Sequence, residues 1–193
     1  MWKFIKRKLR DALGKRKKQP KDSRNEMEKR IARLRQRGVR IGERCAILTE
    51  EFSTEPYLVE LGNHVAVTGG VQFLTHDASF WLIRDTHPNT QHLGRIVVGD
   101  NTYIGQSSIL LPGTRIGAGC IIGAGSVVRG IIPDNSLVIG NPARVVGRAS
   151  LLVSRLLNSP DTLDSLHFPE DERRALLERH FGVVPGKNSP GTA

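Results

Sequence analysis

The sequence lacks the features of several protein classes. It has only two cysteines, Cys45 and Cys120, in 193 residues, too few for the disulfide framework of a small secreted domain. No apolar run approaches the roughly 18 to 20 residues that a membrane-spanning helix needs. No apolar segment followed by a small-residue cleavage site marks a signal peptide. We therefore expect a cytoplasmic protein in which both cysteines stay reduced.

Acidic residues are scarce near the start of the chain. Residues 1–40 contain 17 Lys or Arg and 4 Asp or Glu, and the remainder contains 12 and 15, so the net charge of +10 divides into +13 and −3. Residues 1–18 place Trp2 and Ile5 near one helical face among many cations, as in amphipathic helices that bind anionic membranes. The alternatives are a solvated arm and a helix docked on a neighbouring subunit. We do not expect nucleic acid as a partner, because this arm lacks a recognisable binding fold.

A six-residue period organises residues 98–133, which divide into VGDNTY, IGQSSI, LLPGTR, IGAGCI, IGAGSV and VRGIIP. Each block opens with an aliphatic residue; these are Val98, Ile104, Leu110, Ile116, Ile122 and Val128. The period fits neither an α-helix nor an alternating strand. It predicts a parallel β-helix, whose triangular coils bury the opening aliphatics. Four of the six second positions are glycine, which we expect at the sharp corners.

Weaker copies of the repeat precede this stretch. They begin at Ile41, weaken at residues 53–58, and resume at Leu61 in a shifted register. Between Phe80 and Arg95 the pattern disappears, and the gap contains aromatic, charged and histidine residues. Long excursions from a rigid scaffold usually carry function.

We expect helices at both ends of the solenoid. Asp22 or Ser23 can cap a helix of about 12 to 15 residues that Gly38 ends. This helix can cover the end of the solenoid, where strand edges would otherwise remain unpaired. Residues 169–181 predict a second helix, with proline first and acids in the first turn.

The predicted organisation has three parts. Residues 1–38 form a basic helical extension, and residues 39–148 form the β-helix, with an excursion at residues 79–97. Residues 137–147 should close it as a terminal strand with a tight Asn-Pro turn. Residues 149–193 form a helical extension that ends in a disordered tail.

Three segments resemble one family: FLTHDA with the excursion after it, YIGQSSILLPGTRIGAGCIIGAGSVV, and IGNPARVVG. They resemble the hexapeptide-repeat acyltransferases, in the branch that acetylates sugars, which includes maltose, galactoside and polysaccharide O-acetyltransferases. The resemblance covers roughly residues 39–148. It implies a left-handed coil, which spacing alone cannot distinguish from the usual right-handed crossover. It also implies a homotrimer that uses acetyl-CoA.

The same resemblance identifies His76 as the catalytic histidine. An imidazole titrates near neutral pH, so it can accept the proton of a hydroxyl that attacks a thioester. The alternative is a surface histidine held in a turn. Asp77 would orient the imidazole or contact the acceptor, and His87 and His92 would wall the acceptor pocket together with a neighbouring subunit.

The resemblance also implies contacts with acetyl-CoA along a groove between two solenoids. The expected contact residues are Tyr103, Gln106, Ala124, Arg129, Arg144 and Arg148. Gln106 and Ala124 would offer backbone groups to the pantetheine arm. Arg144 and Arg148 would meet phosphate as charge-assisted donors, or lie on the surface without a ligand.

The favoured function is acetyl transfer from acetyl-CoA to a hydroxyl of a sugar or surface-glycan precursor. One alternative is N-acetylation of a nucleotide-linked amino sugar, and another is a non-catalytic scaffold. A third is a zinc hydratase like the carbonic anhydrases of this fold, because His87 and His92 are five residues apart. Zinc needs three protein ligands, and these two lie in an irregular segment beside Pro88, so we expect no metal.

Overall fold

The computed structural model describes residues 21–183, with side chains from residue 25 onward. The basic segment at residues 1–18 and the predicted disordered tail lie outside the described residues. The described chain divides into two compact units, one ending at Leu157 and the other beginning at Asn158.

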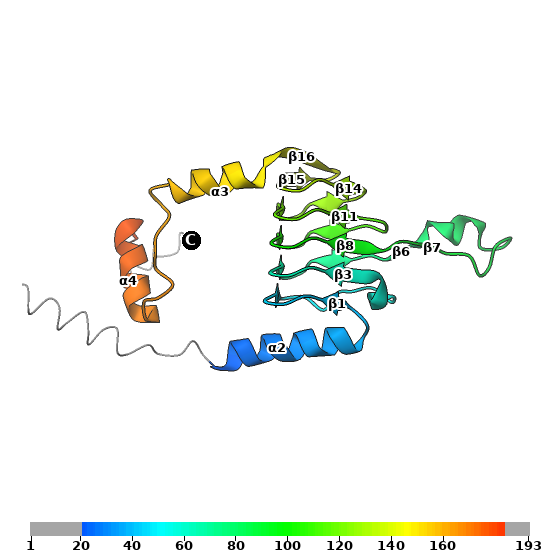
Figure 1. The fold of residues 1–193 in the computed structure, drawn as a ribbon, viewed down its shortest axis with the longest axis horizontal. Helices are drawn as coiled ribbons and strands as arrows, with labels where there is room; N and C mark the ends of the chain where they lie inside the picture. The colour runs from blue at the N-terminus through cyan, green and yellow to red at the C-terminus, as the bar shows by residue number, and fades with distance from the viewer. Residues whose placement is uncertain (1–20, 184–193) are drawn as a thin grey trace, which may run out of the picture. The chain divides into compact units, whose positions relative to one another are not determined.

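Residues 40–148 form a parallel β-helix with three sheets as its sides (Figure 1). Sheet 1 contains β1 (Arg40–Ile41), β3 (Val59–Leu61), β8 (Ile96–Val98), β11 (Arg115–Ile116) and β14 (Ile131–Ile132). Sheet 2 contains β2 (Ala46–Ile47), β4 (Ala66–Val67), β9 (Tyr103–Ile104), β12 (Ile121–Ile122), β15 (Ser136–Gly140) and β16 (Ala143–Arg148). Sheet 3 contains β5 (Gln72–Phe73), β10 (Ile109–Leu110) and β13 (Val127–Val128). The chain passes from sheet 1 to 2 to 3 in each coil, which defines corners 1–2, 2–3 and 3–1.

The core follows the predicted period. The aliphatic residues that open the blocks are all buried, and Leu61, Val67 and Phe73 confirm the shifted register of the earlier coils. The small residues at the fifth position are buried too. Their side chains bond to the next coil: the hydroxyl of Ser108, for example, donates to the carbonyl of Gly123 at 3.0 Å. A hydroxyl is favoured at this position because a buried carbonyl needs a hydrogen-bond donor.

Both cysteines are free thiols, as predicted. Cys120 is fully buried and Cys45 is half-buried. Burial raises the pKa of the Cys120 thiol. Its Sγ lies 3.1 Å from the carbonyl oxygen of Pro133, in the position that Ser and Thr occupy in other blocks.

The glycines at the second position lie at the corners, as predicted, but the reason is close packing and not a left-handed turn. A Cβ on Gly105 would lie 2.6 Å from the backbone nitrogen of Ala124 in the next coil. The left-handed turn falls two residues later, at Ser107, where φ is 56°. A glycine in a sequence does not reveal whether space or backbone conformation requires it.

Helix α2 (Lys21–Gln36) covers the first coil, as expected. It begins before Asp22 and Ser23, so neither is the residue that precedes it, contrary to our prediction. It ends at Gly38, where φ is 97°. The amide of Val39 donates to the carbonyl of Leu34, and the amide of Gly38 donates to that of Arg35, which is a Schellman ending.

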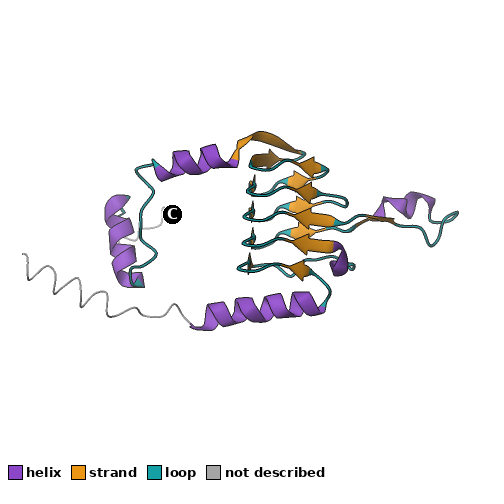
Figure 2. Cartoon of the chain, viewed as in Figure 1, coloured by secondary structure: helices purple, strands orange, loops and turns teal. Residues whose placement is uncertain are grey.

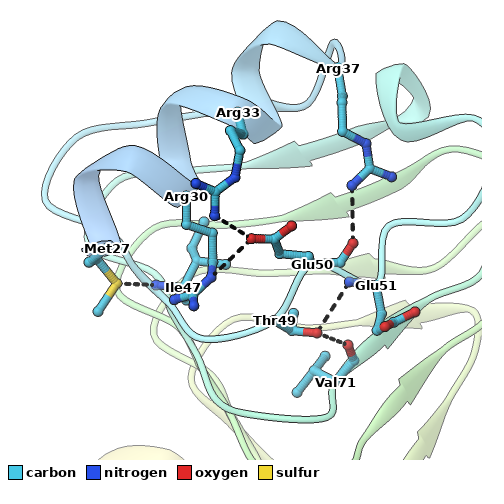
Figure 3. Close-up of polar contacts among 9 residues, drawn as sticks. All are labelled: Met27, Arg30, Arg33, Arg37, Ile47, Thr49, Glu50, Glu51 and Val71. Carbon is cyan, nitrogen blue, oxygen red and sulfur yellow. Dashed lines mark hydrogen bonds and ion pairs between the residues drawn. The ribbon is translucent and has the colours of Figure 1, made fainter. Parts of the chain in front are cut away.

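Arginines of α2, and Arg37 directly after it, bond to carbonyl and carboxylate oxygens on the open edge of the first coil (Figure 3). Arg30 donates to the carbonyl of Ile47 at 3.1 Å, and Arg37 donates to that of Glu50 at 3.1 Å. Arg33 pairs with the Glu50 carboxylate at 2.6 Å. Leu34 is 1% exposed and closes the end of the core. The helix therefore supplies both the apolar plug and the donors that a solenoid end requires.

The excursion projects from the solenoid between sheets 3 and 1 (Figures 1 and 2). It begins with β6 (His76–Asp77), continues through the 3₁₀ helix η2 (Ala78–Ile83), and returns as β7 (His92–Leu93), which pairs antiparallel with β6. Residues 96 and 97, expected in the excursion, already lie in β8. A second 3₁₀ helix, η1 (Pro56–Leu58), occupies the weakened repeat.

The solenoid closes with an antiparallel hairpin of β15 and β16, joined at a cis Asn141–Pro142 bond. Helix α3 (Ala149–Leu157) follows and was not predicted. In the second unit, α4 (Glu170–His180) confirms the predicted helix, with Pro169 preceding it and Gly182 after it at a φ of 65°. No helix within residues 21–183 has the length and apolar character to cross a membrane.

Candidate active site

His76 lies at corner 3–1, where the chain leaves the solenoid for the excursion. Its side chain is 30% exposed. The Nδ1 atom lies 3.0 Å from the Glu55 carboxylate oxygen Oε2. Because a carboxylate only accepts hydrogen bonds, this contact places the proton of the neutral ring on Nδ1. The basic lone pair then lies on Nε2, for which the described part of the chain provides no partner.

Glu55 comes from the same corner of the preceding coil, in the weakened repeat, and its side chain is 14% exposed. Three groups donate to it. The Thr54 hydroxyl donates to Oε1 at 2.6 Å, the Thr75 hydroxyl donates to Oε2 at 2.7 Å, and His76 is the third. Ser53 adds a hydroxyl 3.3 Å from His76 Nδ1. The imidazole is therefore held by a carboxylate that is itself held by hydroxyls.

The hydrogen bonds from Thr54, Thr75 and His76 lower the pKa of the Glu55 carboxyl to about 2. Desolvation opposes this shift but does not outweigh it. The carboxylate thus stays ionised throughout the neutral range. An ionised partner on Nδ1 stabilises the imidazolium that forms when Nε2 accepts a proton.

Asp77 is exposed and turns away from the core position that the repeat would give it. Its carboxylate accepts a hydrogen bond from the backbone amide of Ser79 at 2.8 Å and caps η2. This contact lowers its pKa, with smaller contributions from His92 and Arg129. Within residues 21–183, no side-chain hydrogen bond connects the Asp77 carboxylate to the imidazole of His76. The structure therefore gives Asp77 a local role in shaping the excursion.

Within the part of the chain that the structure describes, His87 and His92 belong to no cluster of side chains that could bind a metal. Both are exposed, and His87 Nδ1 lies 2.9 Å from the hydroxyl of Thr86. His92 lies on β7 opposite Asp77. Across residues 21–183, no group of three His, Cys, Asp or Glu side chains could hold a metal ion.

The residues expected to contact acetyl-CoA lie on different parts of the solenoid, and all of them are exposed. Gln106 and Ala124 follow β9 and β12, so both lie at corner 2–3. Arg129 lies at corner 3–1, the corner of His76, and is near enough to lower the pKa of Asp77. Tyr103 is on the outer face of sheet 2, and Arg144 and Arg148 are on β16.

Comparison with known proteins places this architecture in a family. The family model "Bacterial transferase hexapeptide (six repeats)" matches residues 95–130. Protein CapG of Staphylococcus aureus is 39% identical over 141 residues, which cover 72% of this chain and 82% of that protein. This chain belongs to the bacterial hexapeptide-repeat transferases.

Solved structures agree on the fold. The hexapeptide-repeat acetyltransferase VCA0836 of Vibrio cholerae, complexed with acetyl-CoA, is 28% identical with a TM-score of 0.50, covering 58% of this chain and 61% of that one. A second structure of VCA0836 covers 72% of this chain and 87% of that one, at 21% identity and a TM-score of 0.51. The predicted left-handed β-helix and the predicted enzyme class, an acyltransferase, are confirmed.

Sequence reasoning missed the groups that hold His76 in the candidate site, namely Glu55 and the hydroxyls around it, from Ser53, Thr54 and Thr75. Glu55 lies where the repeat weakens, at residues 53–58, and that weakening was a signal that we did not use. A residue where the repeat weakens does not have to be one of the aliphatic or small residues that the solenoid core requires. Its partner was still not predictable, because 20 residues separate Glu55 from Thr75.

Proposed function

We propose that this protein is an acetyl-CoA-dependent O-acetyltransferase that acts on a hydroxyl of a sugar or surface-glycan precursor. The observation that carries the proposal is the contact between Glu55 and His76. It leaves a partly exposed imidazole with a proton held on one nitrogen and an available lone pair on the other, as a general base requires.

The proposed reaction is a direct transfer. His76 Nε2 accepts the proton of the acceptor hydroxyl while the oxygen attacks the thioester carbonyl carbon. The tetrahedral intermediate then collapses, the carbon–sulfur bond breaks, and the proton passes from Nε2 to the departing thiolate of CoA. Glu55 keeps its charge throughout and orients the ring.

Acetyl-CoA is the proposed donor because VCA0836, which shares this fold, has been solved in complex with it. Gln106 and Ala124 would offer backbone groups to the pantetheine arm from corner 2–3. The guanidinium groups of Arg144 and Arg148 are exposed on β16 and suit phosphate.

The positions of these residues support a proposed site that is shared between copies of the chain. His76 and the pair Gln106 and Ala124 occupy opposite ends of sheet 3, at two different corners of one solenoid. In the proposed homotrimer, corner 3–1 of one copy meets corner 2–3 of the next. The excursion, with Trp81 76% exposed and Leu82 89% exposed, provides apolar surface for that neighbour, and His87 and His92 would wall the acceptor pocket.

The test is release of CoA thiol from acetyl-CoA in the presence of a panel of sugars and amino sugars. His76→Ala should lower turnover by roughly a hundredfold or more. His167→Ala, which changes an exposed histidine of the second unit, is the control and should not. A loss of only two- or threefold for His76→Ala would reject the general base. Acetylated nitrogen in the product would favour the N-acetyltransferase alternative.

Residues 1–18 would hold the enzyme against an anionic membrane, where a lipid-linked glycan would be within reach. Deletion of these residues should release the protein from vesicles that contain anionic lipid. Unchanged sedimentation with the vesicles would reject this part of the proposal.

A further inference from the structure

The buried hydroxyls of the solenoid share one hydrogen-bonding pattern, to which Thr75 is an exception. The other buried hydroxyls that the structure describes in the solenoid donate to backbone carbonyls; they belong to Thr49, Thr102, Ser108, Thr114, Ser126 and Ser136. Thr75 is 0% exposed, and its hydroxyl donates instead to the Glu55 carboxylate, 2.7 Å from Oε2. The stacking of coils, which the other hydroxyls serve, therefore does not explain the hydroxyl of Thr75.

The backbone of Thr75 is fixed at the neck of the excursion. Its carbonyl accepts a hydrogen bond from the amide of Gly94 at 2.8 Å. Gly94 in turn packs against the next coil, where a Cβ on Gly94 would overlap the backbone of Gly113. A β-branched side chain has few rotamers, so a fixed backbone also fixes the direction of the hydroxyl. Thr75 is thus a rigid, buried donor, whereas Thr54, the other threonine that bonds to Glu55, is exposed.

Thr75 and His76 meet the same oxygen of Glu55. Oε2 accepts the Thr75 hydroxyl and lies 3.0 Å from His76 Nδ1, while the Thr54 hydroxyl donates to Oε1. The hydroxyls of Ser53 and Thr54 also lie near Nδ1, at 3.3 and 3.4 Å. A hydroxyl can donate as well as accept. If Oε2 moved away, either hydroxyl could donate to Nδ1, and the proton of the neutral ring would then lie on Nε2.

We propose that Thr75 is a positioning residue that selects the tautomer of His76. Its hydroxyl holds Oε2 of Glu55 against Nδ1, so the neutral ring keeps its proton on Nδ1 and its lone pair on Nε2. This inference rests on the proposed function, in which Nε2 accepts the proton of the acceptor hydroxyl. Without the Thr75 hydroxyl, the carboxylate is free to turn, and Ser53 and Thr54 compete for Nδ1. A ring protonated on Nε2 cannot act as the base.

Nitrogen NMR of the full-length protein with labelled histidine tests the proposal directly, because it reports which ring nitrogen carries the proton. The His76 signals are identified by their loss in His76→Ala, and spectra are recorded at a pH where the ring is neutral. Thr75→Val keeps the shape of the buried side chain and removes the hydroxyl, and Thr75→Ser keeps the hydroxyl. Wild type and Thr75→Ser should carry the proton on Nδ1, and Thr75→Val should carry much of it on Nε2.

The control is Thr102→Val, which makes the same change at a buried hydroxyl of corner 1–2 that donates to the carbonyl of Gly117. It should leave the tautomer of His76 as in the wild type. Melting curves confirm that each variant folds. Thr75→Ala also removes the hydroxyl and gives the same comparison should Thr75→Val fold poorly.

Turnover adds an independent arm. Thr75→Val should lower kcat roughly tenfold with little change in KM, because most molecules then carry the proton on the wrong nitrogen. Thr75→Ser should restore most of the loss. In a Glu55→Ala background, Thr75→Val should change kcat by less than about twofold, since a residue that acts through Glu55 then has nothing to position.

Three outcomes would overturn the inference. They are a proton that stays on Nδ1 in Thr75→Val, an equal loss of kcat with and without Glu55, and the same change of tautomer in Thr102→Val. Failure of the proposed function looks different. If Thr75→Val moves the proton to Nε2 while His76→Ala keeps its turnover, Thr75 positions the ring and the proposed mechanism fails.

Discussion

Residues 98–133 and the corner that holds His76 use the same coil in different ways. In residues 98–133, each side chain lies over an equivalent one in the next coil, and the buried hydroxyls donate to carbonyls of neighbouring coils. At corner 3–1, Glu55, Thr75 and His76 form contacts found at no other corner of the described chain. The periodic residues stabilise the solenoid. Residues at corner 3–1 that depart from the period instead present polar side chains at the surface.

The comparison predicts that stability and turnover respond to different substitutions. Leu110 is fully buried in the periodic stretch. Leu110→Ala should lower the free energy of unfolding by about 2 to 5 kcal/mol, because it removes apolar contacts and leaves a cavity. Chemical denaturation measures the loss. Turnover per folded molecule at low temperature should remain at the wild-type level, and a large loss of turnover would remove the distinction between the two regions.

Glu55→Gln tests the other side of the comparison. The single amide oxygen of glutamine can accept the hydrogen bonds from Thr75 and His76, but its NH2 group cannot accept the one from Thr54. The side chain also carries no charge to stabilise the imidazolium. Since a hydrogen bond to a charged group contributes about 1.5 to 3 kcal/mol, kcat should fall roughly ten- to hundredfold.

The control for this variant is Glu51→Gln, an exposed glutamate nearby. A positioning role predicts that kcat falls more than KM rises, and that the pH profile of kcat shifts. Equal pH profiles for Glu55→Gln and the wild type would contradict the role that we assign to Glu55.

Close packing between coils gives a smaller effect. Gly105→Ala would bring a Cβ to 2.6 Å from the backbone of Ala124, and it should destabilise the protein by about 1 to 3 kcal/mol. Gly69 has open space around its Cβ position, so Gly69→Ala should change stability by less than about 0.5 kcal/mol. Thermal melting distinguishes the two. Similar melting temperatures for Gly105→Ala and Gly69→Ala would show that neighbouring coils can move apart to accommodate the added Cβ.

The smallest expected effect is on stability in acid. The folded-state pKa of Glu55 is lowered to about 2, so its contribution is present above the ordinary pKa of a glutamate. It is lost as pH falls toward about 2. Because the Glu55 side chain is partly exposed, we expect only a modest effect. At neutral pH the free energy of unfolding of the wild type should exceed that of Glu55→Gln by about 1 kcal/mol, and the difference should vanish in acid. If the wild type and Glu55→Gln still differ in free energy of unfolding at low pH, the charge of Glu55 is not the cause of the difference.

The fold was largely predictable, and the candidate site was predictable in part. Regular spacing identified the core residues from Val98 to Val128, because each one occupies the same place in its coil. Helix α3 is nine residues long and escaped prediction because periodicity alone cannot distinguish so short an apolar run from a strand. His76 was predicted as the catalytic histidine from the resemblance of FLTHDA to one family, whereas the contact of Glu55 with its ring depends on the stacking of one coil on another.

The sequence by itself determined the β-helix, its buried row of aliphatics, the free thiols and the helix over the first coil. These features follow from local spacing and composition, so the residues of each segment are enough to predict them. The tertiary structure decided which groups meet at the corners: the carboxylate of Glu55 beside the imidazole of His76, and His64 against Asn101. Such contacts join residues that are distant in sequence, and only the stacking of coils brings them together.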